Sequence, residues 1–181
     1  MLSLFQLTGS VFKIRSIFAL QIVTVDMKHI GFKFSVVLFF AVVAMISCKK
    51  EDQMAIDEEL IMNFIAEHQS DFNGNEAQRT ESGLYYVIEE PGSADHPTLQ
   101  SEVTVSYIGI FLDGVIFDNG NDITFPLTNV IQGWQEGIPL FGRGGKGWLM
   151  IPSHLGYGNT FRPGIPPNSV LVFYIELKDF Q

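Results

Sequence analysis

Residues that commonly perform covalent or metal chemistry are few in this chain and do not cluster. Four histidines, His29, His68, His96 and His154, lie far apart, and none has a partner at the spacing of a metal-ligand pair. Ser153 directly precedes His154, so the two side chains diverge, and no nucleophile motif surrounds them. The sequence therefore predicts no metal site, no cofactor and no covalent intermediate.

A glycine-rich segment, FGRGGKG at residues 141–147, has the composition of a phosphate-binding loop. Its spacing differs from GxxxxGK[ST], and it leads into a predicted strand instead of a helix. We interpret it as a turn. An enzyme with this sequence would therefore have to act through the shape of a pocket and the exclusion of water.

Trp134 follows Gly133 in the segment VIQGWQEGIPLF, residues 130–141. Glycine lets another backbone or a ligand approach closely, so this pair is typical of a tryptophan whose ring forms the floor of a cavity. Each aromatic residue taken alone predicts only a position in the core. The walls of such a cavity have to come from other segments of the chain.

The elements that could supply these walls are mostly strands, because the hydrophobic period beyond Gly83 is two. The predicted strands are residues 83–90, 102–111, 115–118, 147–151 and 170–180. Asp113-Gly114 predicts a hairpin turn, and residues 133–141 are the one helix-like stretch in this part. The fold class is therefore α+β, an antiparallel sheet with one short helix against it.

Residues 48–82 are predicted to form a tether, a short helix and a linker. Ile56, Leu60 and Phe64 recur at helical spacing, with Ile61 and Ile65 beside them, and together they predict one apolar helical stripe. Such a helix could pack on the following domain or extend it from a membrane. The stripe also permits dimerisation, although nothing in the sequence favours it, and we expect a monomer.

The segment MKHIGFKFSVVLFFAVVAMISC, residues 27–48, has the layout of a signal peptide. Its apolar run is too short to cross ~30 Å of hydrocarbon comfortably, which disfavours the alternative of a transmembrane anchor. The last four residues, Met45 to Cys48, resemble the lipobox of bacterial lipoproteins. Cys48, the single cysteine of the chain, is the predicted lipid-attachment site, and residues 27–47 are the predicted signal peptide.

Residues 1–26 precede this complete signal, so we interpret them as a gene-model extension, with translation starting at Met27. The chain of 181 residues has 11 Lys and Arg against 20 Asp and Glu, a net charge of −9. Nucleic acid is a poor partner for so acidic a protein. The resemblance to lipoproteins implies a lipid-anchored protein of the cell envelope, and Lys49 after the cysteine favours the outer membrane.

Several motifs from residue 83 onward occur in an order that points to one family. They are VTVSYIGIF (103–111), DGVIFD (113–118), VIQGW (130–134), GYG (156–158), IPPN (165–168) and LVFYIEL (171–177). Together they resemble the FKBP family of peptidyl-prolyl cis/trans isomerases, with the predicted domain spanning residues 83–181. The resemblance implies a half-open antiparallel sheet wrapped around one short helix.

The resemblance also implies a pocket between helix and sheet, with Trp134 as its floor. The implied catalytic residues are Tyr107, Phe117, Asp118, Ile131, Trp134, Tyr157 and Phe173. The implied substrate-binding residues are Val130, Ile165, Ile123 and Arg162. Ile123 stands where the family often has a wall aromatic, and Arg162 stands where it often has a histidine or a small residue.

The implied activity is rotation of Xaa-Pro bonds in exported proteins, without a cofactor, and macrolide ligands of the family are expected to compete. A non-catalytic chaperone module with the same fold is the alternative, and a purely structural envelope lipoprotein is a third possibility. The short helix before the domain resembles that of gliding-motility-associated lipoproteins of Bacteroidetes. That lineage and role follow from resemblance alone.

Overall fold

The computed structural model describes residues 52–181, so Cys48 and the predicted signal peptide lie outside the described residues. The first element of this part is a helix over residues 52–67, which we call the first helix. The later elements are η2 (Gln69–Phe72), β1 (Gln78–Arg79), β2 (Tyr85–Glu90), β3 (Glu102–Ile110), β4 (Ile116–Pro126), η3 (Leu127–Asn129), α2 (Gln132–Gly137), η4 (Ile138–Leu140), β5 (Lys146–Ile151), η5 (Ser153–Leu155) and β6 (Leu171–Phe180).

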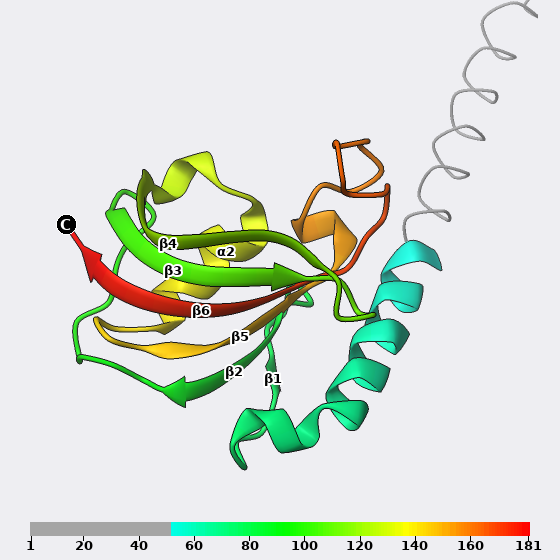
Figure 1. Cartoon of the computed structure of the whole chain (residues 1–181), viewed down its shortest axis with the longest axis horizontal. Helices are drawn as coiled ribbons and strands as arrows, with labels where there is room; N and C mark the ends of the chain where they lie inside the picture. The colour runs from blue at the N-terminus through cyan, green and yellow to red at the C-terminus, as the bar shows by residue number, and fades with distance from the viewer. Residues whose placement is uncertain (1–51) are drawn as a thin grey trace, which may run out of the picture. The chain divides into compact units, whose positions relative to one another are not determined.

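The strands form one antiparallel sheet in the order β1-β2-β5-β6-β3-β4. The sheet curves around α2, as Figure 1 shows. This architecture confirms the expected open antiparallel sheet with one short helix. Two strands differ from the prediction: β1 was not predicted, and β4 extends well beyond the predicted residues 115–118.

Gly133 lets α2 lie directly on the sheet. A Cβ atom at this position would lie 2.5 Å from Cγ2 of Ile151 on β5, closer than any side chain tolerates. The sequence predicted that another segment or a ligand approaches Gly133 closely, and in the structure that segment is strand β5. The contact sets the distance of the neighbouring Trp134 from the strands.

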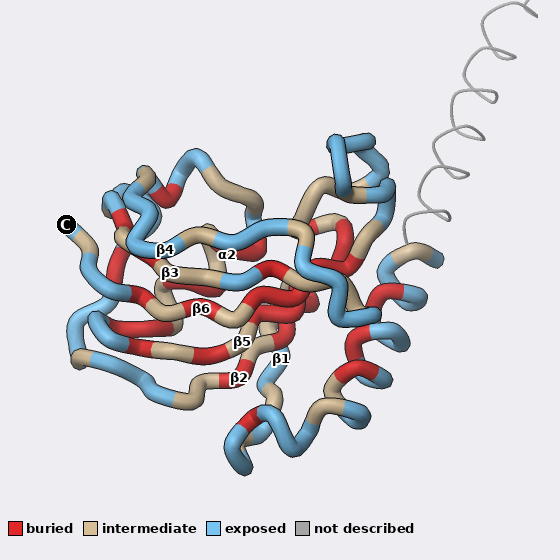
Figure 2. The backbone as a smooth tube through the Cα atoms, viewed as in Figure 1, coloured by how far each residue is buried: buried red, intermediate tan, exposed pale blue. Residues whose placement is uncertain are grey.

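Figure 2 shows that buried residues lie on the strands, on α2 and on the first helix. They form two hydrophobic clusters, one on each face of the sheet. The cluster between the sheet and α2 consists of Leu84, Val103, Val105, Leu127, Trp134, Ile138, Phe141, Leu149, Ile151, Leu155, Leu171, Phe173, Ile175 and Leu177. The cluster under the first helix consists of Ile61, Phe64, Phe72, Tyr85, Val87, Met150, Val170 and Val172. Residues 171–173 alternate between the two clusters, as the two-residue period of a strand requires.

The first helix turns only part of the predicted apolar stripe to the sheet. Ile61 and Phe64 are buried and Ile65 packs against the cluster under the helix, whereas Ile56 and Leu60 are 50% and 41% exposed. Asp57 takes an inward position together with Ile61 and Phe64 and is fully buried. The prediction was wrong at Ile56 and Leu60, because a stripe chosen for its apolar residues passes over a buried acid.

Asp57 joins the first helix to the segment that follows β5. Its Oδ2 atom accepts hydrogen bonds from the backbone N–H and the hydroxyl of Ser153, at 2.8 and 2.6 Å. Its Oδ1 atom accepts one from Nε2 of Gln53 at 2.7 Å. A buried carboxylate is tolerated because donors of this kind replace its hydration. In residues 52–181, every helix is too short or too polar to cross a bilayer.

Candidate active site

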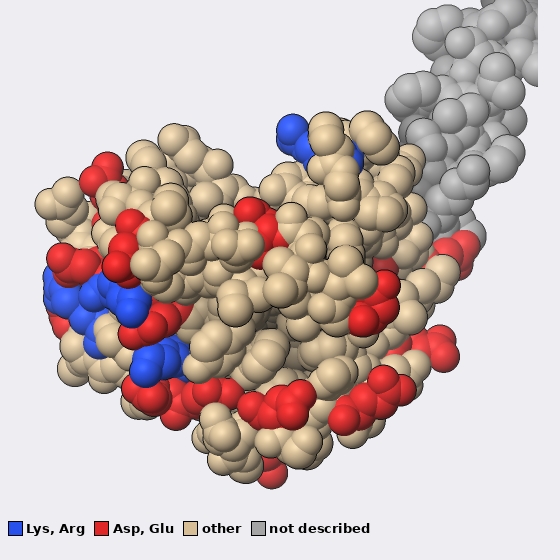
Figure 3. All heavy atoms as spheres, viewed as in Figure 1, with Lys and Arg blue, Asp and Glu red and all other residues tan. Residues whose placement is uncertain are grey.

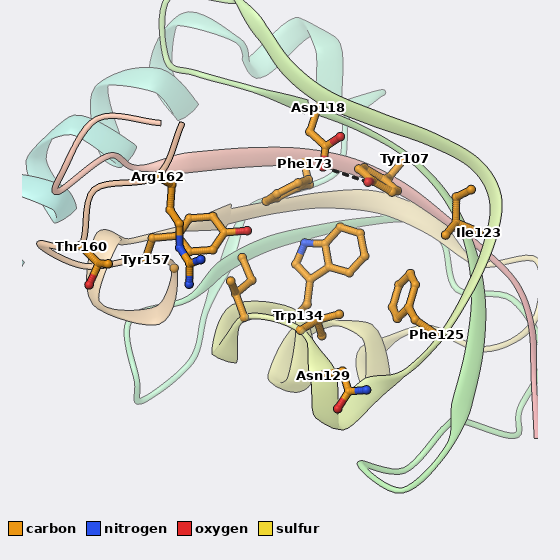
Figure 4. A pocket seen from close by; sticks show the side chains of 13 residues that line it. Tyr107, Asp118, Ile123, Phe125, Asn129, Trp134, Tyr157, Thr160, Arg162 and Phe173 are labelled. Carbon is orange, nitrogen blue, oxygen red and sulfur yellow. Dashed lines mark hydrogen bonds between the residues drawn. The ribbon is translucent and has the colours of Figure 1, made fainter. Parts of the chain in front are cut away.

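A cavity of about 680 Å³ lies between α2, the concave face of the sheet and the loop that joins β5 to β6 (Figure 4). Its lining residues are Tyr107, Asp118, Ile123, Phe125, Asn129, Val130, Ile131, Trp134, Gly156, Tyr157, Thr160, Arg162 and Phe173. We call Tyr107, Asp118 and Phe173 the sheet wall, and Tyr157, Thr160 and Arg162 the loop wall.

Trp134 forms the floor, and its indole is almost fully buried. Tyr107 from β3 and Phe173 from β6 meet this ring edge to face, with centroids 4.9 and 5.1 Å away and interplanar angles of 87° and 79°. Perpendicular aromatic contacts of this kind are attractive and hold the rings in defined orientations. The result is an apolar surface fixed by packing from three elements.

The floor also carries an unused hydrogen-bond donor. Nε1 of Trp134 is buried and has no hydrogen-bond partner among the described residues. A buried N–H without an acceptor is energetically costly, and such groups are uncommon in folded proteins. The site can therefore accept a ligand with a suitably placed acceptor without first breaking an internal bond.

The sheet wall contains one polar pair. The hydroxyl of Tyr107 donates to Oδ2 of Asp118 at 2.9 Å, and Oδ1 of Asp118 accepts the N–H of Asn119 at 2.9 Å. Burial, followed by this hydrogen bond and the charge of Asp118, raises the pKa of Tyr107 to about 12. The phenol therefore stays protonated at neutral pH and keeps Asp118 engaged.

The loop wall has no ladder of strand hydrogen bonds behind it. Gly158 N–H donates to the Ser153 carbonyl at 2.8 Å, and Asn168 N–H donates to the Gly158 carbonyl at 2.7 Å. Ser153 is itself held by Asp57 of the first helix. The position of Tyr157 thus depends on a chain of contacts that begins about a hundred residues earlier in the sequence.

Nine of the eleven predicted site residues line this cavity: Tyr107, Asp118, Ile123, Val130, Ile131, Trp134, Tyr157, Arg162 and Phe173. Phe117 and Ile165 do not line it and pack behind it. The Phe117 ring lies 5.4 Å from that of Phe173, and Ile165 packs against the cluster under α2. The roles assigned to all eleven residues stay predictions.

The structure adds residues that the sequence did not single out. Phe125 lies with its ring 5.6 Å from that of Trp134 and lines the cavity, as Ile123 does. It stands two residues from Ile123, so extending the strand prediction past residue 118 would have placed both on one face. Asn129 and Thr160 also line the cavity and gave no signal in the sequence.

Among residues 52–181, no group of three or more His, Cys, Asp or Glu side chains is placed to hold a metal ion. The cavity offers aromatic surface, one engaged acid, one arginine and a few unpaired donors. Such a set can bind an apolar group and orient its neighbouring amides, and it contains no nucleophile positioned beside a base.

Comparisons with known proteins agree on one family. Residues 93–178 match the model for the FKBP-type peptidyl-prolyl cis-trans isomerase. The chain is 42% identical over 120 residues to the FKBP-type peptidyl-prolyl cis-trans isomerase FkpA of Escherichia coli K12, covering 64% of this chain and 44% of that protein. It is 33% identical to the probable FkpA of Neisseria meningitidis serogroup B, covering 84% of this chain and 67% of that protein.

Solved structures give the same result. The crystal structure of FkpA from Escherichia coli superposes with a TM-score of 0.58 at 33% identity, covering 84% of this chain and 74% of that one. The crystal structure of AtFKBP13 gives 0.54 at 31% identity, covering 59% of this chain and 99% of that one. The chain therefore belongs to the family of FKBP-type peptidyl-prolyl cis-trans isomerases.

Proposed function

We propose that this protein accelerates cis/trans rotation of Xaa-Pro bonds in polypeptides, with the proline ring seated on Trp134. The supporting observation is a cavity whose floor is a buried tryptophan with Tyr107 and Phe173 packed edge to face on it. Because the chain spans only 44% of the Escherichia coli relative, the activity is proposed for this chain on its own geometry.

Rotation about an Xaa-Pro bond moves no proton, so a pocket can catalyse it without an acid or a base at that bond. Rotation about a peptide bond faces a barrier of roughly 18–20 kcal/mol because amide resonance is lost in the twisted state. The twisted amide has a less polar carbonyl than the planar one, so a dry aromatic surface stabilises it relative to the well-solvated ground state. Binding of this kind favours the transition state and lowers the barrier.

Two donors are available to hold the substrate's carbonyls on either side of the rotating bond. The N–H of Ile131, at the start of α2, and the hydroxyl of Tyr157, on the loop wall, donate to no acceptor within residues 52–181. We assign them to substrate carbonyls. Asp118 and Tyr107 satisfy each other and keep the sheet wall in place during the rotation.

Exchange of a Leu-Pro peptide, followed by NMR in the presence of the full chain, tests this proposal. Wild-type protein is expected to accelerate exchange, and a macrolide ligand of the family is expected to compete. A chain that is folded by circular dichroism and binds unfolded polypeptide, yet gives no acceleration, would establish the chaperone module instead. A chain that binds no peptide at all would leave only the structural lipoprotein.

We also propose that Cys48 is lipidated and anchors the protein in the outer membrane. The support is the sequence of residues 27–49, with its signal-like run, its cysteine and the lysine that follows. More than one acyl chain would give stable anchoring. Cys48→Ser is expected to move the protein from the membrane fraction to the soluble fraction, and resistance of intact cells to protease would exclude surface exposure.

A monomer is the expected oligomeric state. The first helix buries Ile61 and Phe64 against its own sheet, so this side is unavailable to a second copy. Light scattering of the purified chain tests this expectation. The proposed role in gliding motility rests on resemblance, and deletion of the gene followed by a colony-spreading assay would test it.

A further inference from the structure

Residues 52–181 contain 18 Asp and Glu but only five Lys and Arg. Four of these cations are engaged by acids on the protein itself. The pairs are Arg79–Glu58, Arg143–Asp95 and Arg143–Asp179, Lys146–Glu90, and Lys178–Glu176. The fifth, Arg162, makes no ion pair within this part of the chain, and it lines the cavity.

Figure 3 shows two groups of cations on one face. One group gathers at an end of the sheet among acidic residues. The other lies on the loop between β5 and β6, where Arg162 is the one Lys or Arg. Arg79 belongs to neither group, because it lies on β1 and pairs with Glu58 of the first helix. An unpaired cation is unexpected on so acidic a protein, because nearby carboxylates are abundant. Because Arg162 lines the pocket, an acidic group on the bound substrate can serve as its ion-pair partner.

The backbone of Arg162 is fixed by a tight turn. Ile165 N–H donates to the Arg162 carbonyl at 3.0 Å, and Arg162 N–H donates back at 3.4 Å. Pro163 and Gly164 fill the two central positions, and Gly164 has a φ of +81°, which glycine adopts without strain. The side chain therefore starts from a defined point on the rim.

The guanidinium lies over the ring of Tyr157, with Cζ 5.2 Å from the centroid. Figure 4 shows this pair at the end of the cavity opposite Ile123 and Phe125. Stacking on an aromatic ring leaves the guanidinium edge free, and that edge matches a carboxylate in a two-point hydrogen bond. On the sheet wall, the Asp118 carboxylate already accepts hydrogen bonds from the Tyr107 hydroxyl and the Asn119 N–H, whereas the Arg162 guanidinium has no carboxylate partner within residues 52–181.

We propose that Arg162 makes the site select prolyl peptides with an aspartate or glutamate within three residues of the proline, in the part of the peptide that crosses the loop wall. This inference rests on the proposed isomerase function and names its substrate class. The protein's overall negative charge opposes acidic peptides only weakly, because charges beyond about 8 Å are largely screened at physiological ionic strength. The ion pair between Arg162 and an acidic residue of the peptide is in direct contact, so salt screens it less.

The test uses the full chain and peptides with a central Leu-Pro bond. Glu, Gln or Lys is placed in turn at each of the two positions before the leucine and the two after the proline. At one position, kcat/KM and affinity should follow the order Glu, Gln, Lys, with Glu favoured over Gln by about two- to fivefold, the range of exposed ion pairs. Arg162→Gln should abolish this preference, and Arg162→Lys should keep part of it.

Lys178→Gln is the matched control, since it removes one positive charge from β6 while leaving the cavity lining unchanged. It should preserve the preference for Glu. The preference should also shrink between about 0.1 and about 1 M salt, as the Debye length falls from about 10 to about 3 Å. A preference that persists in Arg162→Gln, or wild-type protein that treats Glu and Gln alike, would overturn the inference.

Affinity is measured alongside rate so that the two proposals can fail separately. Peptides that bind with an Arg162-dependent preference but are not isomerised would refute the isomerase and keep the selection of acidic peptides. A Leu-Pro parent that is isomerised without any effect of Glu would refute the selection and keep the isomerase.

Discussion

The two walls of the cavity are built in different ways. The sheet wall stands on β3, β4 and β6, and continuous antiparallel pairing places Tyr107 beside Ile175 and Phe173 beside Gly109. The loop wall stands on residues that belong to no long strand and depend on a few single hydrogen bonds. One of these leads to Asp57, a buried acid on the first helix.

The difference shows where the first helix matters for the site. A sheet positions its side chains through many local bonds, so losing one bond shifts little. A loop held by few bonds opens more easily, because local stability follows the density of contacts. The first helix, which precedes the matched family region of residues 93–178, supplies the loop's anchor in this chain. Substitutions in the floor and then in each wall test whether the two walls differ in this way.

Trp134→Ala should have the largest effect because this ring is the floor of the cavity and Tyr107 and Phe173 of the sheet wall pack on it. Truncating a buried tryptophan costs about 3–5 kcal/mol of unfolding free energy. Peptide binding should be lost as well. Denaturant unfolding and peptide titration would measure the two effects.

The chain offers its second tryptophan as the control. Trp148 lies on the opposite face of the sheet, packed on Phe72 and Tyr174. Trp148→Ala should lower stability by less, because this ring is only partly buried, and should leave peptide affinity near the wild-type value. Equal losses of binding in both variants would show that affinity follows global stability and not the floor.

Asp57→Ala comes next and should act on the loop wall alone. It leaves the N–H and hydroxyl of Ser153 buried without their acceptor, at a cost of about 2–4 kcal/mol for the two groups. Because Tyr157 follows on the same loop, KM should rise more than kcat falls. Steady-state kinetics at a temperature where the variant is folded would separate these terms.

Asp57→Asn retains one acceptor oxygen and should restore part of both stability and KM. Glu59→Ala, an exposed acid on the same helix, should change neither. If Asp57→Ala lowers stability but leaves KM as in the wild type, the loop wall does not depend on this anchor.

Asp118→Asn should have a smaller effect, confined to the sheet wall. The amide oxygen can still accept the Tyr107 hydroxyl, so stability should change by less than about 1 kcal/mol. Loss of the charge should lower kcat/KM by about two- to fivefold, since a single hydrogen bond strengthened by charge is weakened. Asp122→Asn is the matched control: this acid is also on β4, accepts a hydroxyl from Ser106 at 2.9 Å, and does not line the cavity.

The resemblance to the FKBP motifs, and not strand alternation, implied the residues of the floor and the sheet wall. Tyr107, Trp134 and Phe173 meet in the structure as expected. Phe125 was not predicted as a cavity residue, because residues 119–122 do not show the apolar alternation of a strand and β4 was therefore predicted to end at residue 118. Residues 119–122 form an irregularity in which Val105 pairs with Ile123 and Tyr107 with Gly120, so β4 carries one extra residue that interrupts the two-residue period.

The burial of Asp57 was not predicted for a different reason. Helical periodicity identifies faces by their apolar residues, and an acid in that row is read as a surface position. Its burial depends on two donors from Ser153, 96 residues later, a contact that no local pattern contains. The residues of the sheet wall were thus implied by the order of the family's motifs, whereas the anchor of the loop wall depends on a tertiary contact between Asp57 and Ser153.

The smallest expected effect is an alkaline change in stability from Tyr107. Its pKa is about 12 in the folded protein and about 10 in an unfolded chain. The neutral phenol is favoured by folding, so its contribution is complete below about pH 10 and is lost as the pH rises towards 12. Tyr107→Phe should therefore make the unfolding free energy fall less steeply between pH 10 and 11 than in wild-type protein.

Tyr174 on the opposite face provides the comparison, because burial and Glu89 raise its pKa to about 12 as well. Tyr174→Phe should flatten the same part of the curve. Asp118→Asn should lower the pKa of Tyr107 without touching that of Tyr174, since it removes the charge but not the burial that is the largest cause. Absorbance titration of tyrosinate in the three variants checks this, and a Tyr107 midpoint near 10 in wild-type protein would mean that the sheet wall does not hold its phenol as the structure indicates.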